Sequence, residues 1–235
     1  MLKVALAEEE KAGGAVIAWW NGIGAARVLE HDGDALLLER AEGARSLSAM
    51  ALDGHDDEAT HILCDVIATL HRERPSPPPP VTHLTTWFHD LSTLPPGGRS
   101  LIAQAADAAA SLLASQQDPV VLHGDVHHGN VLDFGDRGWL AIDPKGLFGE
   151  RTFDYVNLFR NPDIANPSTV LARDPARFSR RLDIVVERGG VDRQRLLLWI
   201  LAFCGLSAVW TLADQRKPII DLFIGGLAAQ ALGRA

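Results

Sequence analysis

The stretch Val120–Pro144 reads VVLHGDVHHGNVLDFGDRGWLAIDP and decides the prediction of the fold. Apolar runs at both ends of this stretch are typical of short β-strands, and the residues between them are typical of a polar loop and a hairpin. The loop carries Asp125 and, five residues later, Asn130; Asp143 follows 13 residues after Asn130, at the end of the second strand. The pattern predicts a catalytic loop between strands.

This spacing of two aspartates and an asparagine is typical of phosphoryl transfer. A loop aspartate such as Asp125 can orient an attacking hydroxyl group and accept its proton. The side-chain oxygens of Asn130 and Asp143 suit Mg²⁺, a hard cation that prefers oxygen ligands and bridges nucleotide phosphates. Residue types and spacing therefore indicate a magnesium-dependent kinase chemistry.

Strands and one helix are predicted before residue 41, and mostly helices after residue 46. The expected strands are Leu2–Leu6, Ala25–Glu30 and Ala35–Arg40, and the expected first helix is Glu8–Trp20, which Gly13 and Gly14 weaken. Apolar residues at helical spacing predict further helices over 56–74, 100–117, 175–188, 193–213 and 218–232. The prolines at 77–80 predict a stiff connector.

Composition excludes several classes of protein. The chain of 235 residues has 22 basic and 30 acidic residues, a net charge of −8 and no lysine- or arginine-rich stretch, so we expect no nucleic-acid partner. The charge suits a cationic small molecule. The uncharged run Leu196–Ala213 is long enough to suggest a membrane span, but we interpret it as a buried helix.

Two further features indicate the compartment. Cys64 and Cys204 have neither metal-ligand spacing nor a disulfide framework, and the start of the chain does not have the pattern of a signal peptide. We therefore expect a cytoplasmic protein without a membrane partner; the oligomeric state stays open.

The segments HGDVHHGNV and AIDPKG resemble the aminoglycoside phosphotransferase family, a branch of the kinase-like fold. The longer context, including WWNGIGAARVLEHDGDALLLERAEG, looks like the subgroup of streptomycin 6-kinases and hydroxyurea kinases. The resemblance covers nearly the whole chain. It implies an α+β, protein-kinase-like fold with a reduced, β-rich small lobe and hinge at 1–41 and a mainly helical large lobe with the catalytic loop at 42–235.

The resemblance also implies roles for the catalytic loop and the strand after it. Asp125 is the expected catalytic base, and Asn130 and Asp143 are the expected magnesium ligands. His123 is expected to support the loop by hydrogen bonds, whereas a zinc site built on His127 and His128 is disfavoured because their near adjacency gives no tetrahedral set.

In the small lobe, the resemblance implies contacts with ATP. Lys3 falls where the family's lysine contacts the α- and β-phosphates, and Glu10 falls where a helix glutamate pairs with that lysine. The backbone of Glu39 and Ala41 is expected to bind adenine at the hinge. Lys145 is interpreted as a surface lysine, with a phosphate contact as the alternative.

One departure from the family pattern concerns the start of the chain. In the family, two strands with a loop over the ATP phosphates precede the lysine strand, and here Met1 lies two residues before Lys3. We expect this chain to bind adenine nucleotide weakly and to turn over poorly, and an upstream segment of a few strands to restore both. Without the phosphate cover, a catalytically silent nucleotide-binding protein is an alternative function.

The expected substrate is a small-molecule antibiotic, with a streptomycin-like aminoglycoside favoured and hydroxyurea as the alternative. The guanidinium groups of streptomycin favour carboxylate partners. Acidic residues that are candidates for contacting the substrate lie after the strand that ends at Asp143. Each also has a structural interpretation, such as a helix cap at Asp154. They are Glu150, Asp154, Asp163, Asp214 and Asp221.

Overall fold

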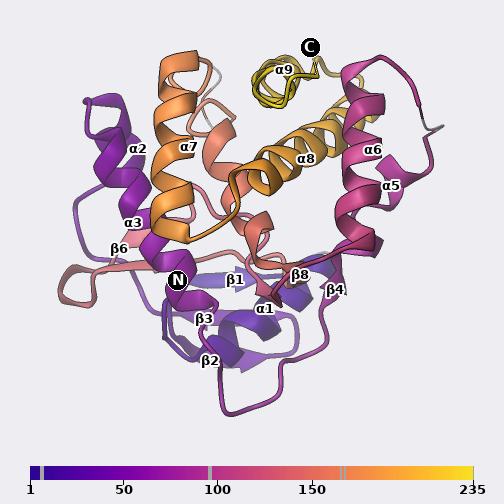
Figure 1. Ribbon diagram of the computed structural model, residues 1–235. Coiled ribbons are helices and arrows are strands. Elements are labelled where there is room, and N and C mark those ends of the chain that lie inside the picture. Colours follow the sequence, from indigo (N-terminus) through magenta and orange to yellow (C-terminus); the bar gives the residue numbers. More distant parts are fainter. Residues whose placement is uncertain (6–7, 95–96, 165, 167, 235) are drawn as a thin grey trace.

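The structure is a computed structural model that describes residues 1–5, 8–94, 97–164, 166 and 168–234. A small sheet with one helix forms one end of the molecule, and helices form the other (Figure 1). The elements are β1 (Leu2–Val4), α1 (Glu8–Trp20), β2 (Val28–Asp32), β3 (Ala35–Leu38), α2 (Leu47–Leu52), α3 (Asp56–Leu70), β4 (Thr82–His83), α4 (Leu84–Trp87), α5 (His89–Ser92), α6 (Leu101–Ala114), β5 (Pro119–Leu122), β6 (Val131–Asp133), η1 (Gly135–Arg137), β7 (Trp139–Ala141), β8 (Leu147–Glu150), the 3₁₀ segment η2 (Arg151–Arg160), α7 (Pro175–Gly189), α8 (Arg193–Ala213) and α9 (Ile219–Ala231).

Within the described residues, the strands form three small sheets. β1, β3 and β2 form an antiparallel sheet in the order β1-β3-β2, in which Leu2 lies opposite Leu37. β8 lies between β4 and β5, parallel to the first and antiparallel to the second. β6 and β7 form the hairpin that the sequence predicted after the catalytic loop. The predicted first strand extended to Leu6, and residues 6–7 lie outside the described part.

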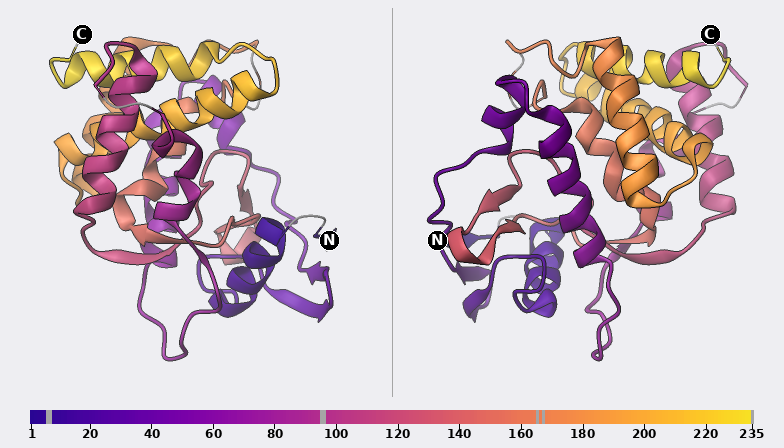
Figure 2. Two further views of the ribbon diagram at one scale, coloured as in Figure 1. Left: turned by 90° about the vertical axis from the view of Figure 1, so that its right-hand side faces the viewer. Right: turned by 60° about the vertical axis from the view of Figure 1, so that its left-hand side comes forward.

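The helical part packs around α8, which crosses its centre against α6, α9 and η2 (Figures 1 and 2). Phe88, Phe153, Trp199 and Phe203 pack there with ring centroids 5.4–5.7 Å apart. Their burial supplies much of the hydrophobic stabilisation of this part, because large aromatic side chains bury the most apolar area.

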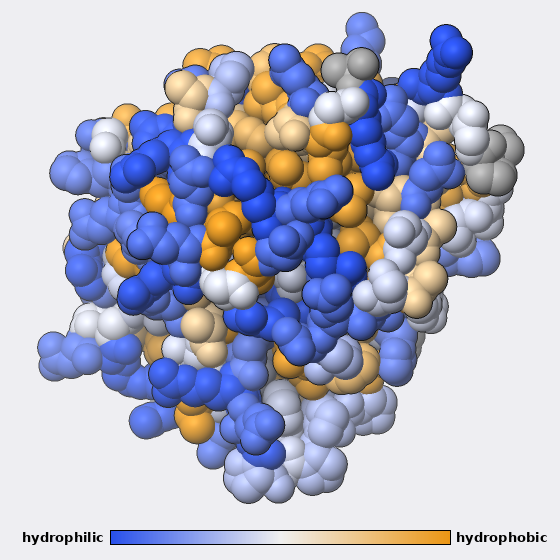
Figure 3. Space-filling view, in the orientation of Figure 1, coloured by the Kyte–Doolittle hydropathy of each residue, from blue (hydrophilic) through white to orange (hydrophobic). Residues whose placement is uncertain are grey.

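Among the described residues, α8 is the helix that is long and apolar enough to span a membrane, and 67% of its most apolar window is buried within the protein. The buried helix predicted at 196–213 is therefore confirmed as a helix of the core. The visible face in Figure 3 is largely hydrophilic, with apolar patches between the charged side chains.

One glycine of α1 and one that follows Asp143 let the small sheet's helix lie close to the catalytic strand. A Cβ atom on Gly13 would lie 1.9 Å from the carbonyl oxygen of Pro144, and one on Gly146 would lie 2.7 Å from the carbonyl carbon of Ala12. The sequence analysis treated Gly13 as a weakness of the helix. The structure shows that its missing side chain lets α1 lie directly against the residues that follow Asp143.

Candidate functional site

A buried carboxylate on η2 anchors the loop between β5 and β6. Asp154 accepts hydrogen bonds from the backbone N–H groups of His123 (3.0 Å) and Gly124 (2.7 Å), and its Oδ2 lies 2.8 Å from Nε2 of His71. Burial opposes ionisation of Asp154, but the hydrogen bonds from His71 and the backbone hold its pKa below the usual range. The sequence interpretations of Asp154 as a helix cap or a substrate contact are wrong: the group is inside the fold and fixes the loop.

His123 supports the loop by hydrogen bonds, as predicted. Its Nε2 lies 2.8 Å from the carbonyl oxygen of Ile142, and its Nδ1 accepts a hydrogen bond from the backbone of Asp125. The ring stacks on Trp20 of α1, with centroids 6.0 Å apart. Burial lowers the pKa of His123. The neutral ring therefore ties the catalytic loop to the end of β7 and to α1.

The carboxylate of Asp125 lies between polar side chains and is only partly exposed to solvent. Its Oδ1 accepts a hydrogen bond from Nδ2 of Asn157, and its Oδ2 lies 3.4 Å from Nδ2 of Asn130, which also donates to the Asp125 carbonyl. Burial raises the pKa of Asp125, while electrostatic interactions with His127, Lys145 and Arg160 oppose that shift. A partly buried carboxylate with one oxygen held by an amide is suited to act as a base.

Five of the seven sequence-predicted site residues line a single cavity of about 210 Å³. They are Lys3, Glu10, Asp125, Asn130 and Asp143. Lys145 lines the same cavity and is half-buried, which favours the phosphate contact over the surface lysine. Side chains from β1, α1, the catalytic loop and the end of β7 thus meet at one place, as the predicted spacing requires.

In the lining of this cavity, Nζ of Lys3 lies 2.6 Å from Oδ1 of Asp143. Asp143 has a φ of 58°, in the left-handed region that non-glycine residues seldom adopt. Such strained backbone is typical of functional sites. Glu10 shares the cavity with Lys3, and the pairing of these two residues stays a prediction.

The predicted hinge lies apart from this cavity. β3 ends at Leu38, and the backbone N–H of Glu39 donates to the carbonyl of Arg27 (3.0 Å). The Glu39 side chain accepts hydrogen bonds from the backbone of Arg27 and from Arg137 of η1. The segment therefore connects the small sheet to the β6–β7 hairpin. Adenine binding by the backbone of Glu39 and Ala41 stays a prediction, as does the division of the chain at residues 41 and 42.

A second cavity, of about 320 Å³, adjoins the first, and Asp125, His127 and Lys145 line both. Trp87 and Trp210 form one of its walls, with their rings 5.4 Å apart in an edge-to-face arrangement. Asn157 and Arg160 of η2 form another. These last two residues were not predicted from the sequence, where their only signal is the polar pair in YVNLFRN.

Most of the acids that the sequence proposed as substrate contacts are partners within the fold. Glu150, Asp163 and Asp221 are buried and pair with Arg195, Arg173 and Arg160, respectively, with nitrogen–oxygen distances of 2.8, 3.1 and 2.8 Å. Asp214 is exposed and pairs with Arg216. Because a buried charge requires a partner, these three carboxylates form ion pairs inside the fold and do not face a substrate.

The oxygen atoms of Asn130 and Asp143 fit a magnesium ion. Mg²⁺ is typically held by one or two protein oxygen ligands together with substrate phosphates and water, and both side chains line the cavity of Lys3. Within the described residues, no cluster of three or more histidine, cysteine, aspartate or glutamate side chains could hold a metal.

Comparisons with known proteins agree with this geometry. Residues 1–215 match the model of the aminoglycoside/hydroxyurea antibiotic resistance kinase family. A streptomycin 3''-kinase from Klebsiella pneumoniae is 50% identical over 99% of this chain and 88% of its own. A streptomycin 6-kinase from Streptomyces griseus is 32% identical over 99% of this chain and 76% of its own.

Solved structures confirm the predicted kinase-like α+β fold. An amicoumacin kinase in complex with AMP-PNP and Ca²⁺ superposes with a TM-score of 0.66 at 13% identity, and the match covers 97% of this chain and 81% of that kinase. At this identity the likeness concerns the fold alone.

Proposed function

Because the chain belongs to the aminoglycoside/hydroxyurea antibiotic resistance kinase family, we propose that it transfers the γ-phosphoryl group of ATP to a hydroxyl group of streptomycin. The family confirms the prediction of an antibiotic phosphotransferase. Streptomycin as the substrate, and the 3''-hydroxyl as its reacting group, rest on the 50% identity to a 3''-kinase against 32% to a 6-kinase.

The observation that carries the proposal is that Asp125 lines two adjoining cavities. One is the cavity of Lys3, Asn130 and Asp143, whose ammonium group and oxygen ligands suit a magnesium nucleotide. The other is the cavity of the two tryptophans, which can receive an acceptor. Group transfer requires donor and acceptor to meet at the catalytic group, and this arrangement permits it.

In the reaction that we propose, the carboxylate of Asp125 accepts the proton of the acceptor hydroxyl group. The hydroxyl oxygen then forms a bond to the γ-phosphorus, and the bond from that phosphorus to the bridging oxygen of ADP breaks. Lys3 binds phosphate oxygens and neutralises their charge. Asn130 and Asp143 would hold Mg²⁺, which would supply positive charge to stabilise the negative charge of the phosphates.

The acceptor cavity favours an aminoglycoside over hydroxyurea. Its volume of about 320 Å³ suits a sugar ring, and hydroxyurea would fill only a small part of it. Trp87 and Trp210 offer ring faces for a guanidinium group. Asp90, whose Oδ2 accepts a hydrogen bond from the Trp210 indole at 2.8 Å, supplies a negative charge beside them.

We infer a cytoplasmic location from the proposed substrate ATP and from the cysteines. ATP is abundant in the cytoplasm, and Cys64 and Cys204 are buried free thiols, as expected in a reducing compartment. We place the protein there.

A steady-state assay of ADP release with streptomycin and hydroxyurea, at matched ATP and Mg²⁺ concentrations, tests the proposal. We expect a kcat/KM for streptomycin at least 100-fold above that for hydroxyurea. An equal or greater kcat/KM for hydroxyurea would contradict the proposal and identify hydroxyurea as the substrate.

A further inference from the structure

We propose that Asn157 is a positioning residue of the phosphotransfer: its side-chain amide holds Oδ1 of Asp125 and thereby fixes the orientation of the carboxylate that accepts the proton. The proposal rests on the function proposed above. Asn157 lies on η2, 32 residues after Asp125, and its side chain reaches the catalytic loop from the helical part of the molecule.

The two carboxylate oxygens of Asp125 have different hydrogen-bond partners. Nδ2 of Asn157 donates to Oδ1, whereas Oδ2 has a single long contact, 3.4 Å, from Nδ2 of Asn130. Asn130 is also a candidate magnesium ligand through its other side-chain atom. A carboxylate held at one oxygen keeps the second at a fixed place, which is the geometric condition for proton transfer to a base.

The orientation of the Asn157 amide is itself fixed. Its Oδ1 accepts a hydrogen bond from Nη1 of Arg160 at 3.1 Å. Because a guanidinium group can only donate, the oxygen of the amide must face Arg160 and the nitrogen must face Asp125. The opposite orientation would set two donors against each other and two acceptors against each other.

Arg160 is held in turn by the C-terminal helices. Its Nη2 donates to Oγ of Ser207 on α8 at 2.7 Å, its Nε lies 2.8 Å from Oδ1 of Asp221 on α9, and its guanidinium group lies 4.8 Å from the ring centroid of Phe203. All of these side chains are buried. Asp125 is thereby connected through Asn157 and Arg160 to the core of the helical part.

This chain of contacts differs from simple core packing. Asn157 and Arg160 both line the acceptor cavity beside Asp125, and Asn157 forms hydrogen bonds with Arg160 and with the catalytic carboxylate. If these polar contacts only stabilised the fold, an apolar cluster of similar volume would stabilise it equally well. Their polar character suits the orientation of a carboxylate that must stay reactive.

The test compares Asn157→Asp with the wild type. The substitution keeps the shape of the side chain and the acceptor for Arg160, but an ionised carboxylate cannot donate to Asp125. We expect kcat for streptomycin phosphorylation to fall at least 100-fold while the KM for ATP stays within twofold. Asn21→Asp, an exposed turn position, is the matched control and should retain wild-type kinetics.

Asn157→Ala is measured alongside, with its Tm, because it adds no charge beside Asp125. We expect a smaller fall of kcat, about tenfold, in a protein that remains folded at the assay temperature. Wild-type kcat in both variants would overturn the proposal. A loss confined to the KM for streptomycin would also overturn it, because it would make Asn157 a substrate-binding group.

A crystal structure of Asn157→Ala gives a readout that needs no acceptor substrate. We expect the Asp125 carboxylate to rotate or to occupy two conformers, and an unchanged single conformer would contradict the inference. Failure of the proposed function gives a different result: the wild type itself would transfer no phosphate to streptomycin, while the structural comparison would still decide the role of Asn157.

Discussion

The ammonium group of Lys3 lies 2.6 Å from Oδ1 of Asp143, so the predicted phosphate-binding cation and the predicted metal ligand neutralise each other. Both groups keep some exposure, with 25% and 44% of their side chains accessible. Binding of a magnesium nucleotide therefore has to exchange this contact for two others: Lys3 with phosphate oxygens, and Asp143 with the metal.

Replacing Lys3 should weaken nucleotide binding. We expect Lys3→Met to raise the KM for ATP about tenfold or more, because a charge-assisted hydrogen bond to phosphate is worth roughly 1.5–3 kcal/mol. Steady-state kinetics measure the effect. Lys11→Met, which removes a surface lysine of α1 that pairs with Asp34, is the matched control. Equal KM values for ATP in the two variants would show that Lys3 does not contribute to nucleotide binding.

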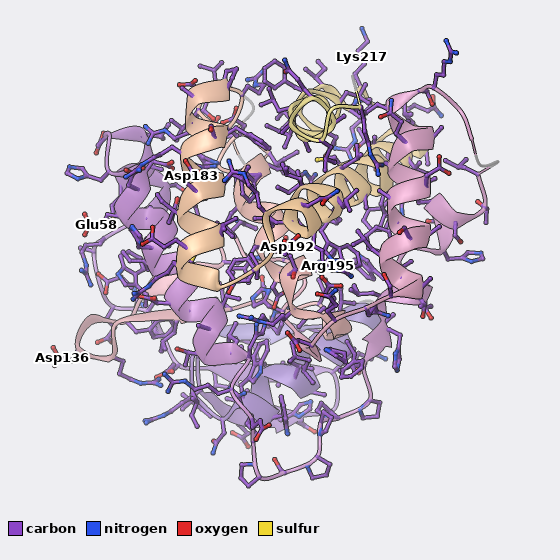
Figure 4. The ribbon with its side chains drawn as sticks, in the orientation of Figure 1. Glu58, Asp136, Asp183, Asp192, Arg195 and Lys217 are labelled. Carbon is purple, nitrogen blue, oxygen red and sulfur yellow. The ribbon has the colours of Figure 1, made fainter. Side chains whose placement is uncertain are left out.

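Asp143 should carry the magnesium dependence of nucleotide binding. In Asp143→Ala, calorimetry should show the same ATP affinity with and without Mg²⁺, because Asn130 alone is an uncharged and weaker ligand. Removal of the metal from the wild type with EDTA should abolish turnover. Asp183→Ala, on the exposed face of α7 (Figure 4), should keep the wild-type response to magnesium. A full magnesium effect in Asp143→Ala would make Asp143 structural.

Loss of the proposed base should affect turnover and not binding. We expect Asp125→Asn to lower kcat about 10²–10⁴-fold, the usual contribution of a positioned acid–base group, with ATP affinity nearly unchanged. Asp136→Asn, at the tip of the β6–β7 hairpin (Figure 4), changes the net charge equally and should have no effect. Wild-type turnover of Asp125→Asn would exclude the role.

Asp154 should contribute stability that depends on pH. Since its folded-state pKa lies below the ordinary value of 3.8, its contribution is present above that value and is lost as the pH falls through the lower pKa. We expect Asp154→Ala to lower the free energy of unfolding by about 3 kcal/mol at neutral pH, because breaking a buried charged contact leaves partners unpaired.

Urea unfolding at several pH values measures this effect. The difference between the wild type and Asp154→Ala should shrink as the pH is lowered below the ordinary carboxyl pKa. Asp65→Ala, which removes an exposed pair with Arg188, serves as control and should leave the urea midpoint nearly unchanged. A constant difference at all pH values would show that packing, and not ionisation, explains the loss.

The sequence predicted the parts of the site that lie close together along the chain. Asp125, Asn130 and Asp143 were recognisable because a loop and a hairpin fix their spacing locally. Asp154 and Asn157 were not, since their roles depend on how η2 packs against a loop some 30 residues earlier. The strand β8 was missed for the same reason, because the short run LFGE forms a strand only through its pairing with β4 and β5.

The helices were predicted well, and one local rule was misleading. The apolar spacing predicted α1 with the bounds that the structure has, and α8 likewise. Gly13 counted against α1 as a matter of propensity, yet tertiary contact with Pro144 explains its presence. Propensity describes an isolated helix and carries no information on how closely another backbone approaches it.

The most direct test of the central claim is the product of one reaction. Streptomycin, ATP and Mg²⁺ are incubated with the wild type, with Asp125→Asn as control, and the product is analysed by mass spectrometry and phosphorus NMR. We predict streptomycin carrying a single phosphoryl group on its 3''-hydroxyl, formed by the wild type and not by the variant. Unmodified streptomycin after incubation with active, folded wild-type protein would contradict the account.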